Sequence, residues 1–262
     1  MEQDWTSYDA AAATHDRLAV PSMFAAPAKD LAVRMDPGGA RATLDVGAGS
    51  GVVASAMRAC PVVVAVDPSI EMLRFARENG IAGVAAGGLP QLPFGDATFD
   101  RVTAGFVLSH VASYQAALAE MVRVLRPGGK LGVTTWSMLD NEFRDYWDGV
   151  VEQVVNRETL RAATARWVPW EDWLADRGRL REAVHDAGLR ELTVEEIEYP
   201  VHISIADFLK IRETSGTGRY LRTVLDGEQF ERFCERMRAD FYARFQDPID
   251  HTRRALIAIG TR

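Results

Sequence analysis

LDVGAGSGVV (residues 44–53) sets three glycines and an alanine directly after an apolar segment that reads as a β-strand, and that segment contains an acid, Asp45. Gly47, Gly49 and Gly51 then open a stretch with helical character. Glycines allow the backbone to approach a ligand closely, and the unpaired N–H groups of the following helix point at that ligand. The stretch therefore predicts a ligand-binding turn between a strand and a helix.

An acid ends the next apolar run. PVVVAVD (61–67) has the continuous apolar character of a buried parallel strand, and Asp67 lies 20 residues after Gly47. An acid at about this spacing commonly receives the two hydroxyls of a ribose, so we expect a ligand that carries a nucleoside. The alternative is that the glycines only form a tight turn and that Asp67 caps the next helix.

The glycine spacing distinguishes between ligand classes. Dinucleotide sites use G-x-G-x-x-G, whereas this chain has G-x-G-x-G with Val52 at the position of the last glycine. Asp45 is unfavourable beside a pyrophosphate and favourable beside an ammonium or sulfonium group. The chain contains no G-x-x-x-x-G-K-[ST], which excludes a phosphate-loop NTPase.

Short apolar strands alternate with helical stretches, which is typical of a parallel sheet covered on both faces. We expect strands at 42–47, 61–67, 81–87, 99–107, 130–136, 192–203 and 252–262, and helices at 52–60, 68–80, 113–129 and 177–189. Residues 137–176 are rich in Trp, Arg and Asp without clean periodicity, and residues 205–247 read as two helices. Both segments are interpreted as insertions into one domain.

Composition limits the partners. With 47% hydrophobic residues and a net charge of -7, the chain lacks the basic excess that favours nucleic acid or an anionic membrane. We find no secretion signal, membrane helix or metal-ligand pattern, and we expect Cys60 and Cys234 to be free thiols in a reducing compartment. These features predict a cytoplasmic protein that acts on a small molecule without a metal. They leave the oligomeric state open, a homodimer included.

Four motifs resemble one family. LDVGAGSG, VAVDPSIEML (64–73), LPQLPFGDATFDRV (89–102) and RVLRPGGKL (123–131) follow one another as they do in Rossmann-like S-adenosylmethionine-dependent methyltransferases, particularly the ubiquinone/menaquinone-biosynthesis type. The resemblance covers residues 42–136. The expected fold is an α/β, doubly wound, seven-stranded and mostly parallel sheet with a final antiparallel strand and helical lid insertions.

The resemblance implies a single methyltransferase domain over residues 1–262. Residues 1–40 would form an N-terminal helical lid, 41–136 the cofactor-binding core, and 137–176 and 205–247 the substrate and lid insertions. Tyr8 in the N-terminal segment would close over the cofactor. The alternative is that Trp5 and Tyr8 only pack this helix onto the domain.

The resemblance also implies how S-adenosylmethionine would be held. The expected contacts are Gly47, Ala48 and Gly49 with the methionine part, Asp45 near its ammonium, Asp67 with the ribose hydroxyls, Pro68 and Met72 beside the adenine, Gly88 and Leu89 at its other edge, and Gly105 and Phe106 on the sulfonium side. The family commonly has an aspartate before LPF that receives the adenine amino group, and this chain has Gly87 and Gly88 there. Adenine contact would then come from backbone groups or another residue.

A base is needed only for some acceptors, because the methyl group of a sulfonium is already activated and catalysis depends mainly on positioning. His110 follows the fourth expected strand at the ligand-binding edge and is the best candidate, with His15 as a weaker one. The alternative for His110 is a helix cap or a hydrogen bond to a loop carbonyl.

The sequence therefore predicts methyl transfer to a small acceptor, with O-, N- and C-methylation all open. Trp167, Trp170 and Trp173 in the first insertion suit an aromatic or other secondary metabolite, although the favoured role of each tryptophan taken singly is to seal the insertion to the core. Two alternatives are a nicotinamide-dependent oxidoreductase and a nucleoside-binding protein without catalysis.

Overall fold

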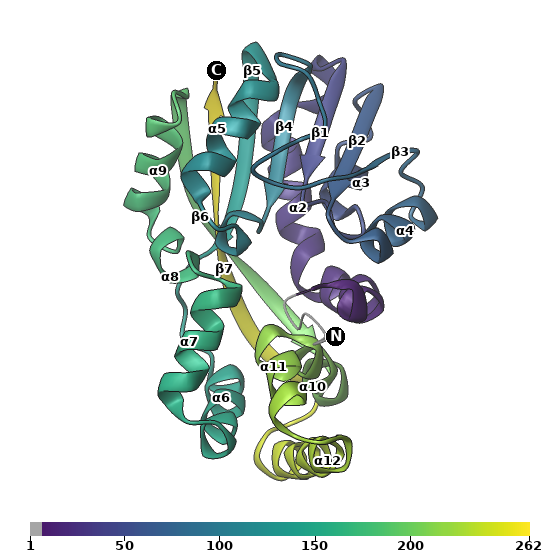
Figure 1. Cartoon of the computed structure of the whole chain (residues 1–262), viewed down its shortest axis with the longest axis vertical. Coiled ribbons are helices and arrows are strands. Elements are labelled where there is room, and N and C mark those ends of the chain that lie inside the picture. The colour runs from purple at the N-terminus through teal and green to yellow at the C-terminus, as the bar shows by residue number, and fades with distance from the viewer. Residues whose placement is uncertain (1–6) are drawn as a thin grey trace.

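The computed structural model describes residues 7–262, and Trp5 lies outside this range. Seven strands form one sheet with the order β3-β2-β1-β4-β5-β7-β6 (Figure 1). The strands are β1 (Ala42–Val46), β2 (Val62–Asp67), β3 (Gly83–Ala86), β4 (Phe99–Gly105), β5 (Leu125–Trp136), β6 (Arg190–Ile203) and β7 (Ile249–Thr261). Only β7 runs antiparallel to its neighbours β5 and β6. The predicted fold class, with its final antiparallel strand, is confirmed.

Helices cover both faces of the sheet. On one face α2 (Ala25–Met35), α3 (Val52–Ala56) and α4 (Ile70–Glu78) pack through Leu31, Met57 and Ala76. On the other face α5 (Tyr114–Val124) and α9 (Arg177–Asp186) enclose the larger core, in which Met121 and Leu180 are fully buried. This is the two-faced cover that a parallel sheet requires.

The two insertions form a helical lid beneath the carboxyl edge of the sheet (Figure 1). The helices of this region are α6 (Glu142–Val154), α7 (Arg157–Trp167), α8 (Glu171–Leu174), α10 (Ile205–Thr214), α11 (Gly216–Val224) and α12 (Gly227–Arg244). All except α8 contribute to a second hydrophobic cluster around Trp147 and Phe241, separate from the core of the sheet. The long strands β6 and β7 reach into this cluster through Val201, Ile203 and Ile249.

The N-terminal segment is helical almost throughout. A 3₁₀ turn (Asp9–Ala11), α1 (Ala12–Thr14) and a π-helix (His15–Phe24) lead directly into α2. The π-helix contains Pro21, which cannot donate to an α-helical ladder. Two further 3₁₀ turns span Pro37–Gly39 and Leu108–His110. Among the described residues, no helix is long and apolar enough to cross a membrane.

Several predicted boundaries were wrong. The helix expected to reach residue 129 ends at Val124, because Leu125 already pairs with Phe99 of β4 as the first residue of β5. The helix predicted over 52–60 ends at Ala56. Residues 137–176, in which the sequence showed no clean periodicity, contain α6, α7 and α8, and residues 205–247 contain three helices rather than two. The missed helix, α11, begins with Gly-Thr-Gly, which has low intrinsic helix propensity.

The lid cluster provides a stability test. Phe241 of α12 is fully buried and packs against Phe208, whereas its neighbour Tyr242 is 48% exposed. We expect Phe241→Ala to lower the free energy of unfolding by about 3–5 kcal/mol because it leaves a cavity, as measured by urea titration. Tyr242→Ala is the matched control and should change it by no more than about 0.5 kcal/mol. Equal effects of the two substitutions would contradict the burial of Phe241 in a hydrophobic core of the lid.

Candidate active site

A cavity of about 1180 Å³ lies between the carboxyl edge of the sheet and the lid. It is lined by every residue that the sequence singled out for catalysis or cofactor binding: Tyr8, His15, Asp45, Gly47, Ala48, Gly49, Asp67, Pro68, Met72, Gly88, Leu89, Gly105, Phe106 and His110. The walls also include residues from α6, α7, α8, α10, α11 and β7. The cavity thus joins the glycine turn to the lid.

The glycine turn has a backbone that a larger residue could not adopt. Gly47 and Gly51 have φ angles of 62° and 85°, in the left-handed region. A Cβ atom at Gly47 would lie 2.5 Å from Cγ2 of Val107. The bare backbone between β1 and α3 is therefore required by geometry and leaves this wall of the cavity open.

Asp45 holds this turn together from below. Its Oδ2 accepts a hydrogen bond from the Ala54 N–H of α3 at 2.9 Å, and its Oδ1 accepts one from the Thr103 hydroxyl of β4 at 2.9 Å. Burial raises the pKa of the Asp45 carboxyl to about 7, against the opposing effect of these hydrogen bonds. Asp45 lines the cavity, but both of its oxygens already serve the fold.

Asp67 closes the turn from the side of β2. Its Oδ2 accepts from the Gly49 N–H and its Oδ1 from the Ser69 N–H, both at 2.8 Å. The alternative helix-capping role is filled by Ser69, whose hydroxyl accepts from the Met72 N–H at the start of α4. A carboxylate offers about four lone-pair sites, so two remain for the hydroxyls of a ligand. Burial is also the main reason why the pKa of Asp67 is raised.

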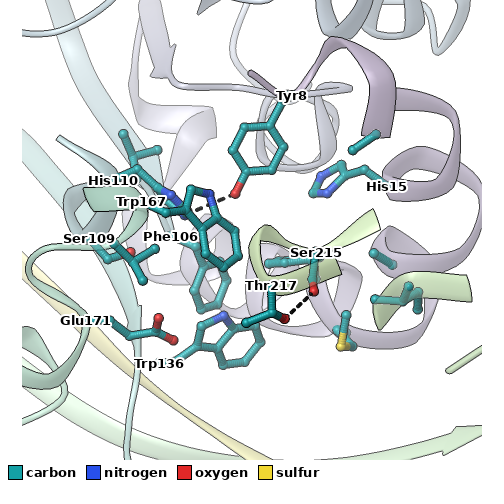
Figure 2. Close-up of a pocket in the computed structure, with 18 of the residues that line it drawn as sticks. Tyr8, His15, Phe106, Ser109, His110, Trp136, Trp167, Glu171, Ser215 and Thr217 are labelled. Carbon is teal, nitrogen blue, oxygen red and sulfur yellow. Dashed lines mark hydrogen bonds between the residues drawn. The ribbon is translucent and has the colours of Figure 1, made fainter. Parts of the chain in front are cut away.

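The N-terminal segment contributes a wall of the cavity. The Tyr8 hydroxyl and Nε2 of His110 lie 3.4 Å apart (Figure 2). The Arg219 guanidinium stacks over the Tyr8 ring at 4.7 Å. Tyr8 thus contacts both the loop after β4 and the lid helix α11. Burial raises the pKa of the Tyr8 hydroxyl to about 12, so it remains a hydrogen-bond donor at neutral pH.

Aromatic rings form the floor between the glycine turn and the lid. Phe106 and Trp136 stack at 4.1 Å between ring centroids (Figure 2). Phe24 meets Phe106 edge-on at 5.2 Å. Phe106 has a φ of 60°, which costs energy for a residue with a side chain and is found most often at functional sites. Sequence reasoning predicted Phe106 and missed Phe24 and Trp136. Trp136 ends the fifth strand at the ligand-binding edge, which was a usable signal.

Both candidate bases lie in the cavity but face different parts of it. Nε2 of His15 would be 3.5 Å from a Cβ at Gly49, so this ring lies over the glycine turn. His110 lies between Tyr8 and Trp167. Removal from bulk water lowers the pKa of each ring to about 4, so both are neutral at neutral pH.

The three tryptophans of the first insertion divide between the cavity and the core. Trp167 ends α7 and lines the cavity. Trp170 donates to the Val111 carbonyl at 2.9 Å, and Trp173 stacks on Tyr114, so both seal the insertion to the core. They do not share one helix, because α8 begins only after Pro169.

Comparison with known proteins identifies the segment that carries the glycine turn. The sequence model of a family described as "Methyltransferase domain" matches residues 44–133. The demethylmenaquinone methyltransferase of Mycobacterium tuberculosis (strain ATCC 25618 / H37Rv) is 42% identical over 111 residues, which are 42% of this chain and 46% of that protein. That of Corynebacterium kroppenstedtii is 39% identical over 40% of this chain and 45% of its own length. The chain thus spans less than half the length of these curated relatives.

Solved structures extend the likeness of the fold to most of the chain. The YcgJ protein of Bacillus subtilis has a TM-score of 0.53 and 20% identity, covering 88% of this chain and 97% of that one. A phosphoethanolamine N-methyltransferase of Haemonchus contortus, solved with S-adenosyl-L-methionine, has a TM-score of 0.55 and 15% identity over 97% of this chain and 57% of that one. At such identities the likeness concerns the fold.

Residues 44–133 therefore form a methyltransferase domain of the class I, Rossmann-like, S-adenosylmethionine-dependent kind. Within this class the segment is similar in sequence to demethylmenaquinone methyltransferases. The resemblance that the four motifs indicated is confirmed for this segment.

The two neutral histidines predict a pH dependence of stability. Their pKa values of about 4 lie below the ordinary 6.5, so between these values the unfolded chain binds more protons than the folded chain. Their stabilising contribution is fully present above pH 6.5 and is lost as the pH falls through about 4. We expect a His15→Gln/His110→Gln variant to lose less thermal stability over this window than the unsubstituted chain. Substitution of the exposed His185 by Gln is the control, and an unchanged slope in the double variant would contradict the low pKa values.

Proposed function

We propose that this chain transfers the methyl group of S-adenosylmethionine to a small-molecule acceptor. The observation that carries the proposal is the continuous cavity, which has a methyltransferase glycine turn at one end and an aromatic floor under a helical lid at the other. A cofactor bound at the turn and an acceptor bound on the floor would share one enclosed space. Such an enclosure favours positioning of the reactants and exclusion of water.

The cofactor half fits a nucleoside joined to an amino acid. The open backbone of Gly47 and Gly49 would lie against the methionine part, and Asp67 has lone pairs left for ribose hydroxyls. Pro68, Met72, Gly88 and Leu89 would enclose the adenine, since all four line the same wall. When bound, the cofactor supplies a methyl group activated on a sulfonium. Asp45 would favour that charge from beneath the turn, and Tyr8 would cover it.

Gly105 and Phe106 would face the reacting end of the cofactor, at the boundary with the acceptor half. His110 would hold the acceptor or take its proton, because its neutral imidazole has a lone pair for this task. His15 lies over the glycine turn and suits the cofactor better than the acceptor. The relatives that match act on demethylmenaquinone by name, but the match covers only 42% of this chain. The lid residues favour a small aromatic acceptor or a comparable secondary metabolite.

The two alternatives find less support. A nicotinamide-dependent oxidoreductase would need room for a pyrophosphate, whereas the turn has Val52 at the third glycine position and Asp45 beneath it. A nucleoside-binding protein without catalysis would not need the second, aromatic half of the cavity. We further propose that residues 1–40, 41–136 and the two insertions act as one domain. The homodimer and the cytoplasmic location stay predictions.

Asp67 provides the test of the cofactor site. We expect Asp67→Ala to weaken calorimetric binding of S-adenosylmethionine at least about tenfold, because a pair of charge-assisted hydrogen bonds is lost. Asp67→Asn keeps the shape and should have a smaller effect, and Asp145→Ala on the exposed side of α6 is the control. Unchanged affinity in Asp67→Ala, with the fold intact by circular dichroism, would remove the cofactor assignment.

His110 provides the test of proton transfer. In a screen of acceptor metabolites with methyl-labelled cofactor, we expect His110→Ala to retain cofactor binding and to lower the methylation rate about 10²- to 10⁴-fold for a hydroxyl acceptor. His185→Ala on the exposed face of α9 should retain the full rate. Full activity of His110→Ala would show that the ring is not the base.

A further inference from the structure

Glu171 lines the acceptor half of the cavity and has no side-chain partner among the described residues. It is the first residue of α8, and Figure 2 shows its carboxylate on the side of the Phe106 and Trp136 rings. Within residues 7–262 this carboxylate takes part in no hydrogen bond or ion pair. Burial raises its pKa, against the opposing charges of Arg253, Arg144 and Arg212. An acid in this state favours a ligand that brings a hydrogen-bond donor.

Arg253 of β7 lies at the same end of the cavity. Its guanidinium stacks on the Trp136 ring at 3.7 Å from the ring centroid, and its Nη1 donates to the sulfur of Met23 at 3.0 Å. No carboxylate of the described chain forms an ion pair with it. Sulfur is a weak acceptor and a guanidinium has five N–H donors, so most of its hydrogen-bonding capacity is unused.

Two other arginines of the cavity wall are already paired with carboxylates. Arg212 pairs with Asp148 at 2.8 Å, and Arg157 pairs with Glu152 at 2.7 Å. Glu171 and Arg253 feel each other's charge but are too far apart to form an ion pair. The two groups therefore present opposite charges to the space above Trp136, and that space is open to a ligand.

We propose that the acceptor is a flat aromatic acid whose anionic group binds Arg253 and whose hydroxyl or amino group donates to Glu171, with its ring on the Phe106–Trp136 floor. Guanidinium groups bind carboxylates through two parallel hydrogen bonds, which fixes the plane of the ligand as well as its position. The floor supplies the apolar and stacking surface that a ring requires. This inference rests on the proposed function, because it names the acceptor class of that same site.

The first experiment tests Arg253 by binding alone. The probes are 2-, 3- and 4-hydroxybenzoate and the three aminobenzoates, titrated into the full chain at saturating S-adenosylhomocysteine. Phenol lacks the acid, and cyclohexanecarboxylate lacks the flat ring. We expect at least one probe to bind, and Arg253→Met to weaken it at least about tenfold. Arg253→Lys should recover part of the loss, and Arg238→Met on the exposed face of α12 should have no effect.

The second experiment tests Glu171 by comparing ligands. The best hydroxy- or aminobenzoate should bind more tightly than benzoate, which has no donor for Glu171. In Glu171→Gln this advantage should fall to less than about threefold, whereas Glu158→Gln, exposed on α7, should preserve it. Because the ionised Glu171 carboxylate accepts the ligand's hydrogen bond, the affinity difference between the hydroxy- or aminobenzoate and benzoate should decrease at low pH. The groups that set this pH dependence are Asp172 beside Glu171 on α8, Arg253 on β7, Arg144 on α6 and Arg212 on α10.

The outcomes separate this inference from the proposed function. If S-adenosylhomocysteine binds but no probe does, or if Arg253→Met leaves the probe affinity within twofold, the acceptor class is wrong and the cofactor site stands. Tight binding of phenol or cyclohexanecarboxylate equal to that of the aromatic acids would also overturn the inference. If S-adenosylhomocysteine itself does not bind, the proposed function fails.

Discussion

The rest of the site depends on the two hydrogen bonds that the Asp45 carboxylate accepts. One oxygen binds the first turn of α3 and the other binds Thr103 of β4, so a single side chain fixes a helix and two strands. These two hydrogen bonds hold the glycines of the turn in one left-handed conformation, whereas an unrestrained glycine backbone adopts many. Because the group is buried and hydrogen-bonded at once, its loss would leave unsatisfied donors in α3 and β4. The preorganisation of the cofactor turn therefore comes from beneath it rather than from the ligand.

Two hydrophobic clusters divide the chain into a sheet core and a lid core. The strands β6 and β7 belong to both, since Val194 and Leu256 pack in the sheet core while Val201 and Ile249 pack in the lid. The cavity lies at the junction, and its floor is built from residues at the carboxyl ends of β4 and β5. The site is thus held by rigid strands on one side and by helices on the other, which suits a reaction that depends on alignment.

Prediction from the sequence was strongest where local pattern and ligand chemistry coincide. The glycine turn and Asp67 follow from short motifs, and the residues inferred from them all line one cavity. The lid was less predictable. Most of its helices pack their apolar faces into a hydrophobic cluster that is separate from the sheet core. The helix α11 begins with glycines, so its sequence does not indicate a helix. Tertiary packing, such as that of Gly216 under the Trp167 ring, stabilises this helix where propensity does not.

Glu171 and Arg253 show a further limit of sequence reasoning. They come from a short helix and from the final strand, 82 positions apart, and no local motif marks either. They come together in one site only because β7 returns to the sheet between β5 and β6 and places Arg253 on the Trp136 ring. The missed residues Phe24 and Trp136 illustrate the same point, because they form the aromatic floor only through their contacts with each other and with Phe106.

The course of β6 and β7 has a consequence for how this architecture can diversify. Residues 205–247 leave the sheet at the end of β6 and return at the start of β7, and these two ends are paired through Ile203 and Ile249. A segment whose ends are already joined by a hydrogen-bonded ladder can change length and sequence without altering the register of the sheet. The helices inserted between β6 and β7 can therefore vary while the strands keep Phe106, Trp136 and Arg253 in place around the cavity.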